Sequence, residues 1–528
     1  MNTIHRSLIL GASAIALSAC GADEIVSPGT GGNITINNNN GGTPTPTPTP
    51  TPTATLVTPA AGCPTISDPV GLTDSGTISG PTGEYRVCTL PAVVSASSTL
   101  PYIEGVLYRL DGRTDVGTDG GPVATGADTE VQLTIEPGVI IYATNTRNPA
   151  FLNVNRGNTI NAVGTAERPI VFTSRDNVQG LNSNASSGQW GGVILSGRAP
   201  ITDCDAPGAT PGTVACERQV EGELQPALYG GATADDNSGR LEFVQIRFSG
   251  FVLSGDAELQ ALTTGGVGSG TRISNVMSFN SSDDGVEFFG GEFDVRNLVV
   301  VGAEDDSLDT DVGAKINMQN VIAIHRPGAG DTMIEADSNN DFTEQQPRQN
   351  TRISNATFIY NGGTEFQDQV FRIRGGTDFA IVNSVAVENV GDVACLRLDL
   401  AETVRAANPA LDDVGPPIFE SFVMDCAVPF RDGSGGVTAA QTEAIFDAGS
   451  NNNDSFANTL TMLFVNGSNE NAVPVFDPTV FDSFFTVPTN IGAVYPGNDT
   501  WVNGWTCNSA TVTFDANVSS CLSLPVYD

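Results

Sequence analysis

The fold is decided by the pentapeptide TRISN, which stands at residues 271–275 and again, unchanged, at residues 351–355. Similar strand-like runs ending in asparagine are FDVRN at 293–297, KINMQN at 315–320 and FAIVN at 379–383. The successive asparagines are therefore 22, 23, 35 and 28 residues apart. Periods of twenty-odd residues, with insertions on some turns, are typical of a parallel β-helix, whose coils bury their apolar faces only by stacking on one another. We expect these five asparagines, Asn275, Asn297, Asn320, Asn355 and Asn383, to form a ladder of side-chain amides at a bend.

A second strand-like piece follows each copy and carries a charge pattern. Aligning the pieces by their apolar residue places in one column Val286, Leu308, Ile334, Phe371 and Leu396. The next residues are Glu287, Asp309, Glu335, Arg372 and Arg397, and two places further along stand Phe289, Asp311, Asp337, Arg374 and Asp399. Because side chains alternate along a strand, we expect the apolar column to face the core and the other two to face outward. The predicted outer face thus carries three acids followed by two arginines.

The pattern also predicts the domain organisation. Earlier coils are expected at residues 134–139 and 164–174, and the repeat fades after residue 403 into an aromatic, cysteine-containing region. We therefore expect a signal peptide at 1–19, a disordered tether at 20–61, the β-helix with its N-terminal cap at 62–403, and a C-terminal cap at 404–528. A cap is required because the open end of a solenoid exposes unpaired strand edges.

The N-terminus predicts a cellular address. Leu17-Ser18-Ala19-Cys20 follows a short apolar segment and resembles the lipobox of bacterial lipoproteins, so Cys20 is expected to become the lipidated first residue, carrying palmitate or a similar acyl chain. By the same resemblance, Ala22 favours the outer membrane. The Asn/Gly stretch and the Thr-Pro run at 43–52 would hold the folded part away from the bilayer, and we expect it to lie at the cell surface. We expect contact with the membrane through the lipid anchor alone.

Composition limits the chemistry. Sixty acidic against 23 basic residues give a net charge of -37, which argues against a nucleic-acid partner. Lys315 is the only lysine, and His325 is the only histidine after the signal peptide, which nearly excludes Schiff-base lysines and multi-His zinc sites. A Ser-His-Asp mechanism would need His325.

The cysteines predict disulfides. Removing Cys20 leaves eight, an even number in an exported chain, which permits 105 connectivities. Proximity in sequence favours the pairs Cys63–Cys88, Cys204–Cys216, Cys395–Cys426 and Cys507–Cys521.

Three separated motifs carry a family resemblance: GQWGGVIL at 188–195, DDGVEFFGG at 283–291, and NIGAV at 490–494 followed by GWT at 504–506. Together they resemble a family of bacterial surface proteins that includes leptospiral outer-membrane lipoproteins and secreted proteins of Bacteroidetes and Proteobacteria. The resemblance implies an all-β, right-handed, single-stranded parallel β-helix of the pectin-lyase-like group, with a disulfide-containing C-terminal cap. It implies no established reaction.

The densest chemical signal is a column of acids. Its members are Asp283, Asp284, Glu287, Asp305, Asp306, Asp309, Asp311, Asp331, Glu335 and Asp337. Carboxylates stacked on adjacent coils, about 4.8 Å apart, repel one another unless a cation intervenes, and calcium, which prefers many oxygen ligands, is the natural candidate. The alternative is structural, with the aspartates satisfying backbone donors in turns while Arg372 and Arg397 neutralise the rest.

Catalysis is a further alternative. The order Asp283-Asp284, Asp305-Asp306, His325 and Arg372–Arg374 is similar to that of polygalacturonases, which use neighbouring carboxylates as acid and base. A lyase resembling pectate lyases would hold calcium on the acids and use Arg372 as base. The catalytic candidates are Asp283, Asp305, Asp306, Asp309 and Arg372.

These observations favour a non-catalytic surface protein that binds a ligand or partner. The partner could be a carbohydrate or, by analogy of compartment, a TonB-dependent transporter. A polysaccharide-degrading enzyme and a structural or adhesion protein remain the alternatives.

Overall fold

The computed structural model describes residues 56–144, 149–220, 227–254, 257–338, 344–363, 369–497 and 499–527. The signal peptide, Cys20 and nearly all of the tether lie outside this part of the chain. Residues Thr55–Asp528 form one compact unit. No helix in the described residues has the length and apolar character needed to cross a bilayer.

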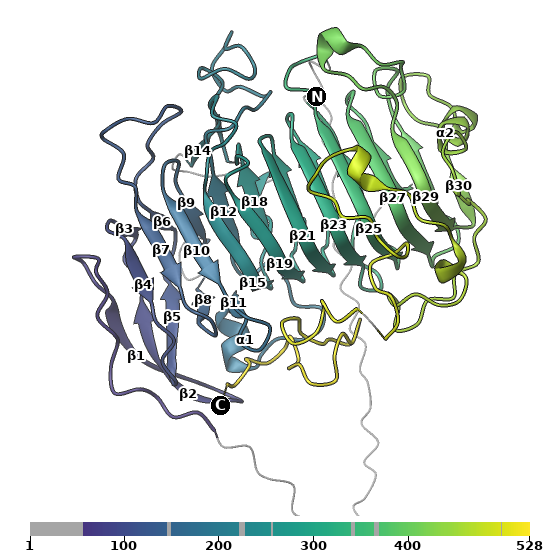
Figure 1. The fold of residues 1–528 in the computed structure, drawn as a ribbon. Helices are drawn as coiled ribbons and strands as arrows, with labels where there is room; N and C mark the ends of the chain where they lie inside the picture. Colours follow the sequence, from purple (N-terminus) through teal and green to yellow (C-terminus); the bar gives the residue numbers. More distant parts are fainter. Residues whose placement is uncertain are drawn as a thin grey trace, which may run out of the picture. The chain divides into compact units, whose positions relative to one another are not determined.

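Two long sheets run along the solenoid (Figure 1). The 15-stranded sheet contains, in spatial order, β1 (Thr73–Gly80), β2 (Gly83–Thr89), β5 (Val106–Leu110), β8 (Ile140–Ala143), β11 (Ile170–Ser174), β15 (Gly239–Arg247), β19 (Arg272–Phe279), β21 (Glu292–Val301), β23 (Lys315–Ile324), β25 (Asn350–Tyr360), β27 (Asp378–Glu388) and β29 (Ile418–Asp425), and off this path β4 (Ser98–Leu100), β7 (Gln132–Ile135) and β10 (Thr159–Val163). The 11-stranded sheet contains β3 (Val93–Val94), β6 (Thr114–Val116), β9 (Leu152–Val154), β12 (Val193–Ser196), β18 (Leu262–Gly265), β20 (Val286–Phe289), β22 (Leu308–Asp311), β24 (Ile334–Ala336), β26 (Gln369–Ile373), β28 (Ala394–Leu398) and β30 (Val428–Phe430).

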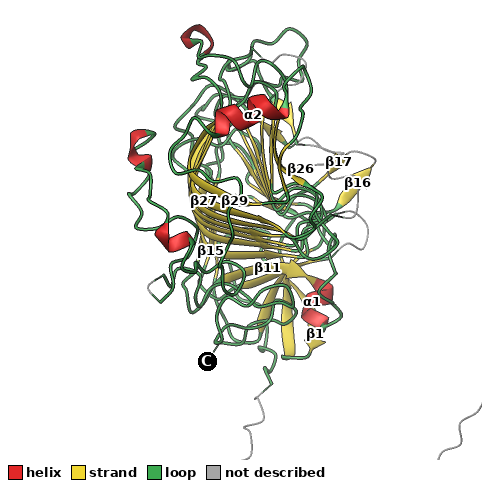
Figure 2. Cartoon of the chain, turned by 90° about the vertical axis from the view of Figure 1, so that its right-hand side faces the viewer, coloured by secondary structure: helices red, strands yellow, loops and turns green. Residues whose placement is uncertain are grey.

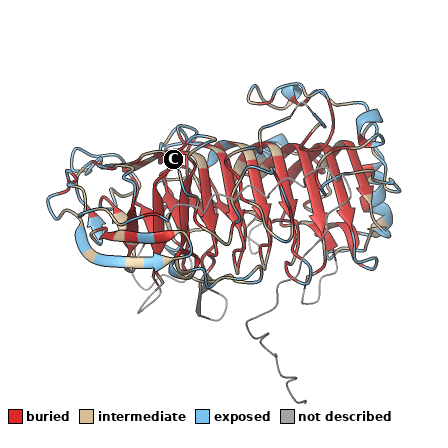
Figure 3. Ribbon diagram, turned by 90° about the horizontal axis from the view of Figure 1, so that it is seen from below, coloured by how far each residue is buried: buried red, intermediate tan, exposed pale blue. Residues whose placement is uncertain are grey.

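The chain alternates between the two sheets, and neighbouring strands within each are parallel except for the β1–β2 hairpin. This is the predicted β-helix. The apolar column is confirmed in register, because Val286, Leu308, Ile334, Phe371 and Leu396 pair in succession. All five are buried in the interior, and Figure 3 shows the buried residues continuing along the strands. Burying such a side chain contributes about 1.5–3 kcal/mol, so stacking coils supplies the stability that a single coil lacks.

The predicted asparagine ladder lies at a sharp corner within the long strands. All five asparagines have left-handed backbone angles, with φ between 50° and 65°. The Nδ2 of Asn297 donates to Asn275 Oδ1 at 3.4 Å, and the Nδ2 of Asn320 donates to Asn297 Oδ1 at 2.8 Å. Further along, Asn355 and Asn383 donate instead to backbone carbonyls of the C-terminal region. The amide ladder therefore covers three coils, and the remaining two corners bind the C-terminal chain.

The solenoid extends beyond its predicted end at residue 403. Strands β29 and β30 add another coil, so the boundary between β-helix and cap lies near residue 430. The sequence pattern missed this coil because Ser421, with φ 51°, takes the corner position that asparagine holds in the five preceding coils. The end is then covered by α2 (Ala439–Phe446), which packs on β28, β29 and β30 and faces the viewer in Figure 2.

The C-terminal region has a second role besides capping. Residues 450–527, here called the strap, run back along the 15-stranded sheet towards its N-terminal end, as the yellow segment in Figure 1 shows. The strap contacts the last coil through the Val423–Asn453 bridge, and at its other end Tyr527 Oη donates to Pro169 O at 2.9 Å. A second apolar core lies between strap and sheet, with Phe464, Ile491 and Trp505 among its strap residues.

All four predicted disulfides are confirmed: Cys63–Cys88, Cys204–Cys216, Cys395–Cys426 and Cys507–Cys521. The remaining elements are short. They are α1 (Arg175–Gln179), the hairpins of β13 (Arg218–Gln219) with β14 (Leu228–Tyr229) and of β16 (Val252–Ser254) with β17 (Ala257–Glu258), and 3-10 turns at Pro409–Leu411, Glu470–Ala472 and Pro478–Val480.

Candidate functional site

The charge pattern on the outer face of the 11-stranded sheet is confirmed by strand register. Glu287, Asp309, Glu335, Arg372 and Arg397 pair in succession across β20, β22, β24, β26 and β28. Three acids are therefore followed by two arginines on adjacent coils, as the repeat predicts.

The arginine half of this face is a network of ion pairs. Arg374 lies 2.7 Å from Glu335 and 2.9 Å from Asp337, and Arg372 lies 3.2 Å from Glu335 and 3.0 Å from Asp399. Glu335 and Asp337 were candidates for cation ligands, but the structure gives them arginine partners instead. Their charges are thus compensated within the protein.

The other half is an acid cluster, defined as Asp283, Asp284, Glu287, Asp305, Asp306, Asp309 and Asp331. Three trios have one carboxylate oxygen per residue within 4.8 Å of one another. The trios are Asp284, Glu287 and Asp309; Asp305, Asp306 and Asp331; and Glu258, Asp283 and Asp305. Gly285 makes this close stacking possible, since a Cβ there would lie 2.3 Å from Val300 Cγ1 and 2.6 Å from Ser307 O.

Some of these carboxylates also stabilise the turns between the two sheets. Asp284 Oδ1 accepts a bond from the backbone N–H of Asp306 at 2.9 Å, and Asp306 Oδ1 accepts one from that of Thr332 at 2.7 Å. Each aspartate thereby ties its coil to the next, which is the predicted structural role. Asp309 differs, because its buried Oδ1 has no hydrogen-bond partner among the described residues.

Burial and mutual repulsion keep the cluster from ionising freely. Burial raises the pKa of Asp283, Asp284, Asp306 and Asp309 well above the ordinary value of 3.8, and neighbouring carboxylates raise it further. The same causes raise the pKa of Asp305 to about 6 and that of Asp331 to about 7. Asp311, another predicted ligand, lies beside the cluster, and burial raises its pKa to about 7. A divalent cation would offset the free-energy cost of ionising these buried carboxylates, since it favours the ionised form of every carboxylate near it.

Two features of this face were missed from sequence. Glu258 completes one trio, but it lies on the β16–β17 hairpin, an insertion outside the repeat columns. Phe289, expected to face outward, is buried against Tyr229 at a ring distance of 5.9 Å. The insertion that contains the Cys204–Cys216 disulfide packs on that part of the sheet and forms a small apolar core with it. The charged part of the face lies outside this core.

The proposed catalytic bases fit poorly. His325 is fully buried beside Tyr360, and burial lowers its pKa to about 4, so it is neutral and out of reach of a substrate. Burial acts to lower the pKa of Arg372, but Glu335 and Asp399 outweigh it and raise this pKa above its usual value. A base must lose its proton near the working pH, which disfavours Arg372.

Comparison with known proteins agrees with the geometry. A family described as "Pectate-lyase like beta helix domain" matches residues 121–506, which contain the acid cluster and the arginine network. No curated protein and no solved structure matches the sequence significantly.

Proposed function

The chain belongs to the pectate-lyase-like β-helix family. We propose that it is a non-catalytic binding protein whose acid cluster holds calcium and presents it to an anionic carbohydrate. The observation that carries the proposal is the trio of Asp284, Glu287 and Asp309, whose oxygens lie within 4.8 Å of one another.

The arginine network supports this assignment by contrast. On the same face, arginines bind Glu335 and Asp337, whereas the buried Oδ1 of Asp309 has no hydrogen-bond partner among the described residues. Calcium takes six to eight oxygens, so three carboxylates leave coordination positions for ligand oxygens. A bound cation would thus connect a negatively charged protein with a negatively charged saccharide.

Calcium binding is the first testable prediction. We expect isothermal titration of residues 55–528 to show saturable calcium binding that Asp284→Asn/Asp309→Asn weakens at least tenfold, because two of three charged ligands become neutral. The matched control is Glu443→Gln/Asp447→Asn, which removes the same charge from exposed positions at α2 and should leave affinity unchanged. If both double variants weaken calcium affinity equally, the effect arises from net charge alone and the proposed site is refuted.

A hydrolase is the second candidate, and one observation favours it. The pKa values of Asp305 and Asp331, about 6 and about 7, suit proton transfer near neutral pH, although their oxygens, within 4.8 Å, lie closer than the roughly 5–9.5 Å between the two carboxyl groups of most glycosidases. If the wild type releases reducing ends from polygalacturonate and Asp331→Asn does not, the protein is a hydrolase and the proposal of non-catalytic binding is wrong. Release of unsaturated products would indicate a lyase.

The cellular address is part of the proposal. We propose that Cys20 anchors the chain in the bacterial outer membrane and that it belongs with the surface lipoproteins it resembles, where a TonB-dependent transporter could receive its ligand. The lipobox at residues 17–20 supports this assignment. We expect the full chain to incorporate labelled palmitate and to sediment with membranes, whereas Cys20→Ala should do neither, because the variant lacks the thiol that carries the proposed lipid. Membrane retention of the unlabelled variant would contradict lipid anchoring.

A further inference from the structure

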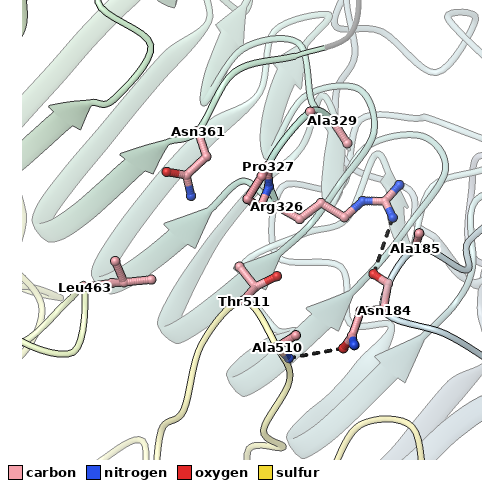
Figure 4. A pocket seen from close by; sticks show the side chains of 10 residues that line it. Asn184, Ala185, Arg326, Pro327, Ala329, Asn361, Leu463, Ala510 and Thr511 are labelled. Atoms are coloured by element: carbon pink, nitrogen blue, oxygen red, sulfur yellow. Dashed lines mark hydrogen bonds between the residues drawn. The ribbon is translucent and has the colours of Figure 1, made fainter.

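A hollow of about 610 Å³ lies between the solenoid and the strap, outside the acid cluster. The turn after β23 contributes Arg326, Pro327 and Ala329, and the strap contributes Leu463 and Ala510 (Figure 4). The volume falls within the range of about 300–1,000 Å³ that is usual for small organic ligands. Most side chains at this surface are apolar, with a single cationic group among the lining residues.

The rim of the hollow carries unusual backbone strain. Met462 and Leu463 have φ of 53° and 74°, in the left-handed region that large side chains rarely adopt. Their turn is closed by two hydrogen bonds between Thr461 and Val465, at 2.8 and 2.9 Å. Despite this strain, the turn exposes apolar surface, because Met462 is 56% and Leu463 38% exposed. Glycine or asparagine would relieve the strain, and strained backbone of this kind is concentrated at ligand-binding and active sites.

The cation in the hollow has unused hydrogen-bonding capacity. Figure 4 shows the side chain of Arg326 extending along the wall to Asn184 and Ala185. Its Nη2 is ion-paired with Glu304, and its Nη1 lies 3.5 Å from Asn184 O. Its Nε has no hydrogen-bond partner among the described residues, although the residue is 9% exposed. A small adjustment of this side chain would offer the Nε–H to an anionic group.

We propose that this hollow binds a small amphipathic carboxylate, with its acidic head at Arg326 and its hydrocarbon body on Leu463 and Ala510. The apolar walls suit the hydrocarbon, the guanidinium suits the head group, and the strained turn holds Leu463 at the mouth. The site is independent of the acid cluster and of the proposed calcium binding.

Octanoate is the probe for the apolar contact. By isothermal titration, residues 55–528 should bind octanoate, and Leu463→Gly should weaken binding at least tenfold, because a leucine contact is lost. The melting temperature should stay the same or rise, since glycine accepts a φ of 74° without strain. Val487→Ala, also at an exposed strap position, is the control and should bind like the wild type.

The head-group contact is tested by comparing octanoate with octan-1-ol. Arg326→Gln/Glu304→Gln keeps the pair neutral and should weaken octanoate tenfold or more while leaving octan-1-ol unchanged. The proposal is overturned if the wild type does not bind octanoate, if Leu463→Gly binds it equally well, or if the double variant weakens both probes alike. Binding to phosphatidylglycerol vesicles without binding to free octanoate would also overturn it, in favour of a lipid surface.

Discussion

In the absence of calcium, residues 55–528 are expected to unfold at a lower temperature at pH 8 than at pH 5. Burial raises the pKa of Asp305 to about 6 and those of Asp311 and Asp331 to about 7, against 3.8 in an unfolded chain. The folded chain therefore holds more protons than the unfolded chain between about pH 4 and pH 7, and stability falls as the pH rises through this window.

The expected effect is large. A pKa near 7 in place of 3.8 corresponds to about 4 kcal/mol for one carboxylate above pH 7, less for Asp331 because solvent screens its partly exposed charge. Below about pH 4 the carboxylates with raised pKa values are protonated in both the folded and the unfolded chain, so they add no further stability. Carboxylates whose pKa is lowered by folding then lose their stabilising interactions, and the free energy of unfolding falls. Burial acts to raise the pKa of Asp399, but its bonds to Ser434 N–H and two arginines outweigh this and lower it, so its stabilisation is lost in acid. The optimum should therefore lie near pH 5.

Differential scanning calorimetry from pH 4 to pH 8, with chelator and with calcium, measures this effect. Calcium should raise the melting temperature at pH 8 and have little effect at pH 5, because protonated carboxylates bind cations poorly; at one hundred times its Kd it adds about 2.7 kcal/mol. The variant Asp309→Asn/Asp331→Asn should flatten the pH profile, whereas Glu443→Gln/Asp447→Asn should keep it. A wild-type melting temperature that does not change between pH 5 and pH 8 would contradict this prediction. It would show that ionisation of the acid cluster does not destabilise the fold.

Arg247→Met is expected to release the end of the strap while the solenoid stays folded. Arg247 is fully buried, and its Nη1 donates to the carbonyls of Cys521 and Ser523 at 3.0 and 2.9 Å. Its Nε donates to Gln245 Oε1 at 2.8 Å. Burial lowers the pKa of this guanidinium to about 10, so the fold holds a cation in its interior in order to tie down the strap.

Methionine keeps much of the side-chain length but removes the Arg247 donor from Ser523 O and Gln245 Oε1, whereas Cys521 O keeps its bond from Asn177 Nδ2 at 3.1 Å. Each buried acceptor without a donor costs about 1–3 kcal/mol, whereas removing the buried charge also removes part of the cost of its desolvation. We therefore expect the free energy of unfolding to fall by about 3 kcal/mol. Hydrogen exchange should accelerate in residues 505–527 and stay slow in β15, β19 and β21. Ala510 and Thr511 line the hollow, so octanoate binding should weaken as well.

The control for this variant is Arg240→Met on the same strand. Arg240 is about half exposed and pairs only with Glu242 among the ion pairs of the described residues, so its replacement should change stability by less than about 1 kcal/mol. If Arg247→Met and Arg240→Met leave the strap equally protected, the buried arginine does not hold it.

Local periodicity was sufficient to predict much of this protein. A solenoid repeats the same backbone environment on every coil, so corner asparagines, core columns and outward charges recur at readable spacings. The register of Glu287 with Asp309 follows from that regularity, whereas the four disulfides follow from the proximity of their cysteines in sequence. The last coil was not predicted because Ser421 replaces asparagine at its corner, and only the left-handed backbone angle identifies that corner.

Other features depended on contacts between residues far apart in sequence. Glu258 approaches Asp283 and Asp305 of the acid cluster from an insertion, and Arg374 neutralises Glu335 and Asp337 from an adjacent coil. The strap crosses the sheet so that Arg247 meets Cys521, and so that Leu463 and Ala510 close a hollow over Arg326. From its repeat, the sequence determined the β-helix and its inward and outward columns, because these arise between neighbouring coils, and from the spacing of its cysteines it determined the disulfides, because each closes a short loop. Only the tertiary structure decided how Arg374 pairs with Glu335 and Asp337 and where the strap lies, because insertions and the C-terminal chain have no period and are placed by packing.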